Sequence, residues 1–266
     1  MLSKFDSSPV FTGTSADYRA LPRVSNSDLT RLKEEHLGYG SLPSAQFSSE
    51  KAKAFGRAFH QHLLEPETIG DVMGELLPDI APNETRQLST LMETIYNDSF
   101  CKRYLQQARK RRAHMGEALR EYVVLFTDPV SQVDCKARLD LVYTSPKRQN
   151  ALILDFKTTS ARTQAQFLES CYTYDYDRQA AFYLDSLRHA DAGVRSWVDT
   201  RRFRFIFVGV MKQKPYRLFA IDATSIPGFI DYGRKKYRFW LRKWQEEQER
   251  PLYQPDRPAI LTTSYS

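Results

Sequence analysis

Two aspartates and a lysine in the middle of the chain have the residue types and the spacing for phosphodiester chemistry. Asp155 and Lys157 stand two residues apart in the segment LILDFK, and Asp140 precedes them in the segment ARLDLV. Alternate side chains of a β-strand project from one face, so a strand would place Asp155 and Lys157 together. Two carboxylates with open water positions suit Mg²⁺, which lowers the pKa of a bound water and stabilises charge on a phosphodiester.

The ordinary interpretation of an Asp-x-Lys sequence is an ion pair on an edge strand, because this pattern arises by chance in many proteins. Here the residues 151–154 before Asp155 are apolar. The carboxylate therefore falls at the end of a core strand, where an unused charge is costly. We favour a catalytic function for Asp140, Asp155 and Lys157, in which the lysine orients the attacking water or helps to deprotonate it.

Periodic patterns predict the elements that position these residues. Helical spacing is expected from Ser25 and over 48–65, 84–112, 163–187 and 225–249, and strand patterns over 119–127, 133–143, 151–157, 203–211 and 216–221. Short turns between the first three strands favour an antiparallel meander. The order of elements predicts an α/β fold with a mixed β-sheet flanked by helices.

Length and charge limit the domain organisation and the class of partner. The 266 residues are expected to form a flexible leader over 1–17 and a single domain over 18–266. Lys and Arg number 39 against 32 Asp and Glu, a net charge of +7, which is the sign expected of a protein that binds polyphosphate. The basic runs 109–112, 201–202 and 234–236 are read either as phosphate contacts or as solvated faces.

The cysteines and the apolar runs indicate the compartment. Cys101, Cys135 and Cys171 are widely spaced and odd in number, which predicts free thiols in a reducing environment. The sequence has no signal-like start and no run of about 18 apolar residues. We expect a soluble cytoplasmic protein without a membrane partner.

Four sequence blocks resemble the PD-(D/E)xK nucleases, and within them the RecE-like and RecB-type exonucleases. Gly56 and His60 resemble the G-x-x-x-H helix of that group, and Gln179 and Tyr183 resemble its Q-x-x-x-Y motif. The spaced acid followed by acid-x-Lys is the third block, with Leu139 in place of the proline of the family's name. The fourth is Tyr18 with the segment SNSDL, similar to the opening of RecE-like domains.

This resemblance implies a fold, a site and an activity. The fold is the restriction-endonuclease-like PD-(D/E)xK core, and the metal ligands are His60, Asp140 and Asp155. Glu121 is expected to face the metal from the first strand, although an exposed strand glutamate is an equal alternative. Gln179 and Tyr183 would bind substrate, the alternative being ordinary helix packing.

The resemblance also implies a cofactor and partners. The cofactor would be Mg²⁺, with Mn²⁺ as a substitute. The activity would be an exodeoxyribonuclease that digests one strand of linear double-stranded DNA from free ends, 5′ to 3′, and leaves single strand for recombination. A single-strand annealing protein and a homo-oligomeric ring are the expected partners.

Two other functions remain open at this point. A PD-(D/E)xK endonuclease uses the same acids and lysine, and a catalytically inactive DNA-binding module would share the fold. The retained Asp140, Asp155 and Lys157 argue against the inactive module. Relatives with an iron–sulfur cluster need four cysteines, and the chain has three.

Overall fold

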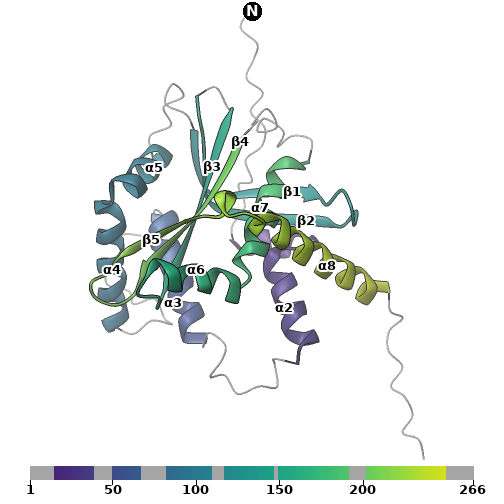
Figure 1. Cartoon of the computed structure of the whole chain (residues 1–266), viewed down its shortest axis with the longest axis horizontal. Coiled ribbons are helices and arrows are strands. Elements are labelled where there is room, and N and C mark those ends of the chain that lie inside the picture. Colours follow the sequence, from purple (N-terminus) through teal and green to yellow (C-terminus); the bar gives the residue numbers. More distant parts are fainter. Residues whose placement is uncertain are drawn as a thin grey trace, which may run out of the picture.

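A mixed five-stranded sheet forms the centre of the computed structural model, which describes residues 15–38, 50–66, 82–109, 117–146, 149–191 and 202–249. The strands lie in the order of the chain (Figure 1). Among them β3 and β4 are parallel and the other neighbours are antiparallel, so the predicted antiparallel meander of the first three strands and the mixed sheet are confirmed. The strands are β1 (Glu117–Thr127), β2 (Asp134–Thr144), β3 (Asn150–Thr159), β4 (Arg202–Met211) and β5 (Leu218–Asp222).

Helices cover both faces of the sheet, because each strand buries alternate apolar side chains on opposite sides. One core joins residues such as Phe59, Leu91 and Phe156, and the other joins residues such as Phe182 and Phe205. The first face carries α3 (Glu50–Leu64), α4 (Pro82–Asn97) and α5 (Ser99–Arg109), and the second carries α2 (Asn26–His36), α6 (Gln164–Thr173), α7 (Tyr176–Arg188) and α8 (Phe229–Glu249).

Two helices that the sequence predicts as continuous are each divided in two. The expected helix 84–112 breaks at Asp98, whose Oδ1 accepts a hydrogen bond from the N–H of Cys101 at 2.8 Å and so starts α5. The expected helix 163–187 breaks at Asp175, which has a left-handed φ of 52°. Asp175 pairs with Lys33 and Lys236, so the break links α7 to α2 and α8.

The segment before α2 is fixed against β2. Helix α1 (Ser15–Ala20) begins inside the expected leader, of which residues 1–14 lie outside the described part. The buried Lys136 ammonium donates to the backbone carbonyls of Tyr18, Arg19 and Leu21 at 2.9–3.0 Å. Because the carbonyls of Tyr18 and Arg19 belong to the last turn of α1, Lys136 holds this segment against β2.

A buried polar network joins α7 and α8. The Tyr237 hydroxyl bonds to Asp185 Oδ2 at 2.8 Å and to Asp128 Oδ1 at 3.2 Å, and Arg234 Nε donates to Asp185 at 2.6 Å. Helix α8 approaches so closely that a side chain at Gly233 would lie 1.9 Å from the carbonyl oxygen of Asp177. Arg234, a member of one predicted basic run, thus supports the fold.

The expectations for the cysteines, for membrane-spanning helices and for the basic runs can be compared with the described residues. The three cysteines are buried and free. None of the described helices combines the length and the apolar character needed to cross a membrane. The basic residues 110–112 and Arg201 lie outside the described part of the chain.

Candidate active site

The strands β1 and β2 are distorted where Glu121 and Asp140 face each other. Arg120 pairs with Leu141 and Tyr122 with Leu139, yet the residues between these pairs, Glu121 and Asp140, form no pair of the ladder. Glu121 has a left-handed φ of 46°. Such a conformation costs a non-glycine residue about 1–3 kcal/mol and persists where the surroundings enforce it, most often at functional sites.

Asp140 also marks the place where β2 separates from β3. The β2–β3 ladder runs from Thr144 and Ala151 to Leu141 and Leu154 and stops there. Beyond it, the N–H of Phe156 donates to Asp140 Oδ2 at 2.8 Å. The carboxylate therefore replaces the missing strand pairing and is held in one orientation by the backbone of β3.

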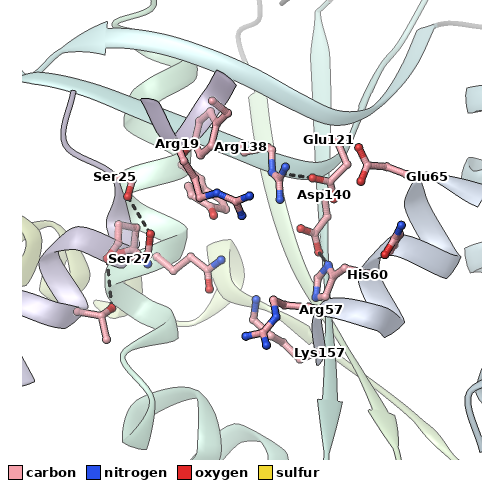
Figure 2. A pocket seen from close by; sticks show the side chains of 16 residues that line it. Arg19, Ser25, Ser27, Arg57, His60, Glu65, Glu121, Arg138, Asp140 and Lys157 are labelled. Carbon is pink, nitrogen blue, oxygen red and sulfur yellow. Dashed lines mark hydrogen bonds and ion pairs between the residues drawn. The ribbon is translucent and has the colours of Figure 1, made fainter. Parts of the chain in front are cut away.

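His60 completes a group of potential metal ligands with these two acids. The ligand atoms of His60, Glu121 and Asp140 lie within 4.8 Å of one another, and in the described residues this is the group with metal-binding geometry. His60 reaches the strands from α3, with its Nδ1 3.4 Å from Asp140 Oδ2 (Figure 2). One imidazole and two carboxylates suit a divalent cation, and carboxylates are preferred by Mg²⁺ and Mn²⁺.

Two carboxyl groups lie close together in this group, and a bound cation would offset their negative charge. Burial and the nearby Asp140 raise the pKa of Glu121 to about 7. Burial disfavours the charged form of Asp140 as well, but His60 and Lys157 outweigh it and lower the pKa of that carboxyl. Asp140 in turn overcomes the effect of burial on His60 and raises its pKa. The donor set therefore fits a divalent metal ion.

Asp155 and Lys157 share one face of β3, as predicted, and form an ion pair. Asp155 is fully buried, and its Oδ2 accepts a hydrogen bond from Gln179 Nε2 at 2.8 Å. Burial raises the pKa of Asp155 to about 6, whereas Asp155 and Asp140 outweigh burial and raise the pKa of Lys157. Lys157 is thus held as an ammonium.

The structure brings together most, but not all, of the expected metal ligands. His60 and Asp140 belong to the group of three, where the predicted partner Asp155 is replaced by Glu121. Asp155 is fully buried, pairs with Lys157 and accepts a hydrogen bond from Gln179. Its assignment as a metal ligand stays a prediction.

A cavity of about 620 Å³ opens above these residues (Figure 2). Glu121, Asp140 and Lys157 line it, and the predicted substrate-binding residues Gln179 and Tyr183 line it from α7. Burial raises the pKa of Tyr183 well above its ordinary value, so its hydroxyl stays protonated. All predicted site residues except the buried Asp155 therefore border one space.

Several residues of the cavity were not singled out from the sequence. Arg138 lies two residues before Asp140 on β2 and contacts Glu121, with 2.7 Å between Nε and Oε2. Arg57 and Arg19 add two more cations, and Glu65 adds an acid. The helical spacing of Arg57, His60 and Gln61 on α3, with Glu65 directly after its end, and the i, i+2 relation of Arg138 to Asp140 were available signals.

Comparisons with known proteins agree with this fold. Residues 33–252 match the model of a family described as a PDDEXK-like domain of unknown function. A search of curated proteins found no match. Among solved structures, the chain is similar to the crystal structure named "Putative exonuclease" from Eubacterium rectale, with 13% identity, a TM-score of 0.53, and 95% of this chain and 99% of that chain covered. This similarity shows that the two chains share a fold.

Proposed function

We propose that this chain, which belongs to the family of PDDEXK-like domains of unknown function, is a metal-dependent deoxyribonuclease. The observation that carries the proposal is the meeting of His60, Glu121 and Asp140 within 4.8 Å, in a cavity shared with Lys157. Three potential metal ligands beside the largely buried ammonium of Lys157 form an arrangement that can hydrolyse a phosphodiester.

The ligands and the lysine would divide the chemistry. His60, Glu121 and Asp140 would hold a divalent ion, which would lower the pKa of a bound water and stabilise negative charge on the phosphate. Lys157, held protonated by Asp155, would orient that water or donate to a phosphate oxygen. This favours the orienting role of the lysine over proton removal. Gln179 would fix the orientation of Asp155 and so of the pair.

The arginines would bind the phosphates of the substrate. Arg19, Arg57 and Arg138 line the same cavity as Lys157, which gives it four cationic side chains beside its acidic ligand group. Guanidinium groups bind phosphate oxygens through two parallel hydrogen bonds. The cavity thus places cations that would bind phosphates next to the acids that would bind the metal ion, with Arg138 itself paired to Glu121.

The finer assignment is an exonuclease that uses Mg²⁺, or Mn²⁺ in its place, and digests one strand of linear double-stranded DNA 5′ to 3′. The positions of His60, Gln179 and Tyr183 in one cavity support it, together with the likeness in fold to a protein named an exonuclease. By the resemblance of its sequence blocks to RecE-like exonucleases we propose a homo-oligomeric ring that leaves single strand for an annealing protein. From its free thiols we propose a location in the cytoplasm.

Digestion of three substrates tests this function. Linear duplex, covalently closed circular duplex and single strands are incubated with and without Mg²⁺, and products are separated on gels. We expect loss of the linear duplex with Mg²⁺ and an intact circle. Rapid nicking of the circle would identify an endonuclease, and no cleavage of any of the three substrates with Mg²⁺ would favour an inactive DNA-binding module.

A further inference from the structure

Three tyrosines are exposed close to one another on the face that carries α6, α7 and α8. Tyr172, Tyr174 and Tyr232 are 44%, 58% and 57% exposed, which makes them half of the large apolar side chains that stand exposed in the described residues. Tyr172 and Tyr174 lie at the junction of α6 and α7, and Tyr232 lies on α8. We call these three residues the tyrosine surface. Grouped exposed aromatic rings mark a binding surface.

Contacts between the segments join the tyrosine surface into one patch. The Tyr172 ring lies 5.2 Å from the ring of Phe229, one turn before Tyr232 on α8. Lys236 Nζ lies 4.8 Å above the Tyr232 ring and 2.9 Å from Asp175, the residue next to Tyr174. The three rings are therefore held by the same junction of α6, α7 and α8.

A chain of side-chain contacts links this patch to the candidate active site. The Tyr174 ring lies 6.0 Å from the Tyr176 ring, and Lys157 Nζ lies 5.2 Å above the Tyr176 ring. Tyr176, Gln179 and Tyr183 recur at i, i+3 and i+7, so they follow one face of α7. A chain of side chains thus leads from the cavity along α7 to the exposed Tyr174.

Most acids around the patch are paired with cations, among them Asp231 next to Tyr232, which contacts Arg234 at 2.8 Å. The nearby carboxylates of Asp175 and Asp177 are paired with Lys236, and Asp175 also with Lys33. Arg162 is exposed and lines an open hollow of about 370 Å³ together with Tyr174. Glu169 on the same rim is one acid beside this arginine. Exposed rings with neighbouring cations and neutralised acids are typical of single-strand binding.

We propose that the tyrosine surface binds single-stranded DNA next to the active site, with bases stacked on Tyr174 and its neighbours. The inference rests on the proposed deoxyribonuclease function, because the strand would continue from the cavity along α7. Stacking on an aromatic side chain tolerates any base, so the surface would hold a strand without reading its sequence. Loss of one such ring weakens single-strand binding roughly tenfold.

Fluorescence anisotropy with a fluorescein-labelled oligodeoxythymidine strand in EDTA tests the surface without cleavage. We expect Tyr174→Ala to bind roughly tenfold more weakly than wild type, and Tyr174→Phe to bind like wild type. Val130→Ala, which shortens another exposed apolar side chain (63% exposed, in the turn between β1 and β2), is the control and should bind like wild type. Equal affinities of Tyr174→Ala and wild type, or an equal loss in Val130→Ala, would overturn the proposal.

Cleavage of linear duplex by the same proteins separates this proposal from the proposed function. If the wild-type protein binds the strand through Tyr174 but cleaves no DNA, the proposal of single-strand binding is supported and the proposed nuclease function is refuted. A wild type that cleaves duplex and shows no dependence of strand binding on Tyr174 refutes the tyrosine surface alone. A wild type that binds no single strand refutes it too.

Discussion

His60 and His62 lie on the same helix but have different surroundings, which makes them a test of the metal site. His60 points to Asp140, whereas His62 Nδ1 bonds to the backbone carbonyl of Ala58 at 2.9 Å. We predict that His60→Ala weakens Mn²⁺ binding about tenfold or more, because a ligand is lost. His62→Ala should leave it unchanged. Isothermal titration of Mn²⁺ measures both, and equal curves for the two variants would remove His60 from the site.

The acids and the lysine of the site could be predicted from their own neighbours in sequence. Asp155 follows an apolar run and stands two residues before Lys157, so one strand sufficed to place both. The location of the Glu121 side chain could not be predicted in this way, because it depends on a left-handed backbone conformation that no local sequence pattern indicates. Local sequence could not show that Glu121, and not Asp155, lies next to His60 and Asp140, because this depends on the arrangement of the strands, which is a tertiary feature.

At the scale of elements, the strands were predicted more closely than the helices. Alternating apolar residues fix which strand residues are buried, and the five strands lie near their expected bounds. The helices divided at Asp98 and Asp175 kept their apolar spacing through the break, so periodicity alone could not reveal it. Asp175 turns because Lys33 and Lys236, distant in sequence, hold its carboxylate.

The packing of α8 on α7 depends on a glycine. Gly233→Ala would place a methyl group against the backbone of Asp177, which cannot give way, so we predict destabilisation by about 3 kcal/mol. Gly56 in α3 has open space at the same position, so Gly56→Ala should raise stability by about 0.5–1 kcal/mol. Urea unfolding of both variants measures the difference. A stable Gly233→Ala protein would contradict the observed contact of the two helices.

At the scale of the whole molecule, the network around Tyr237 predicts an acid limit of stability. Burial opposes the charge of Asp185, but Arg234 and Tyr237 outweigh burial and lower its pKa. A lowered carboxyl pKa stabilises the fold above the unfolded pKa of about 4, and this contribution disappears as pH falls through the folded pKa.

We therefore predict that Asp185→Asn loses stability at pH 7 and shows a shallower further loss between about pH 4 and pH 2 than wild type. Asp231→Asn is the matched control, because Asp231 contacts the same Arg234 with a side chain that is 78% exposed. It should behave like wild type. Urea unfolding at several pH values decides, and parallel pH profiles of wild type and Asp185→Asn would contradict the assignment.

The net charge of +7 and the cationic side chains of the cavity fit a polyanionic substrate, but they do not indicate which reaction the protein catalyses. The central claim is metal-dependent hydrolysis at Asp140. The most direct measurement is release of acid-soluble nucleotides from radiolabelled linear duplex by wild type, Asp140→Asn and Asp134→Asn, each with Mg²⁺ or EDTA. Asp134 lies at the exposed start of the same strand and serves as control. The account predicts release by wild type and Asp134→Asn in Mg²⁺ only, and at least about a hundredfold less by Asp140→Asn. Equal release by wild type and Asp140→Asn, or release that persists in EDTA, would contradict it.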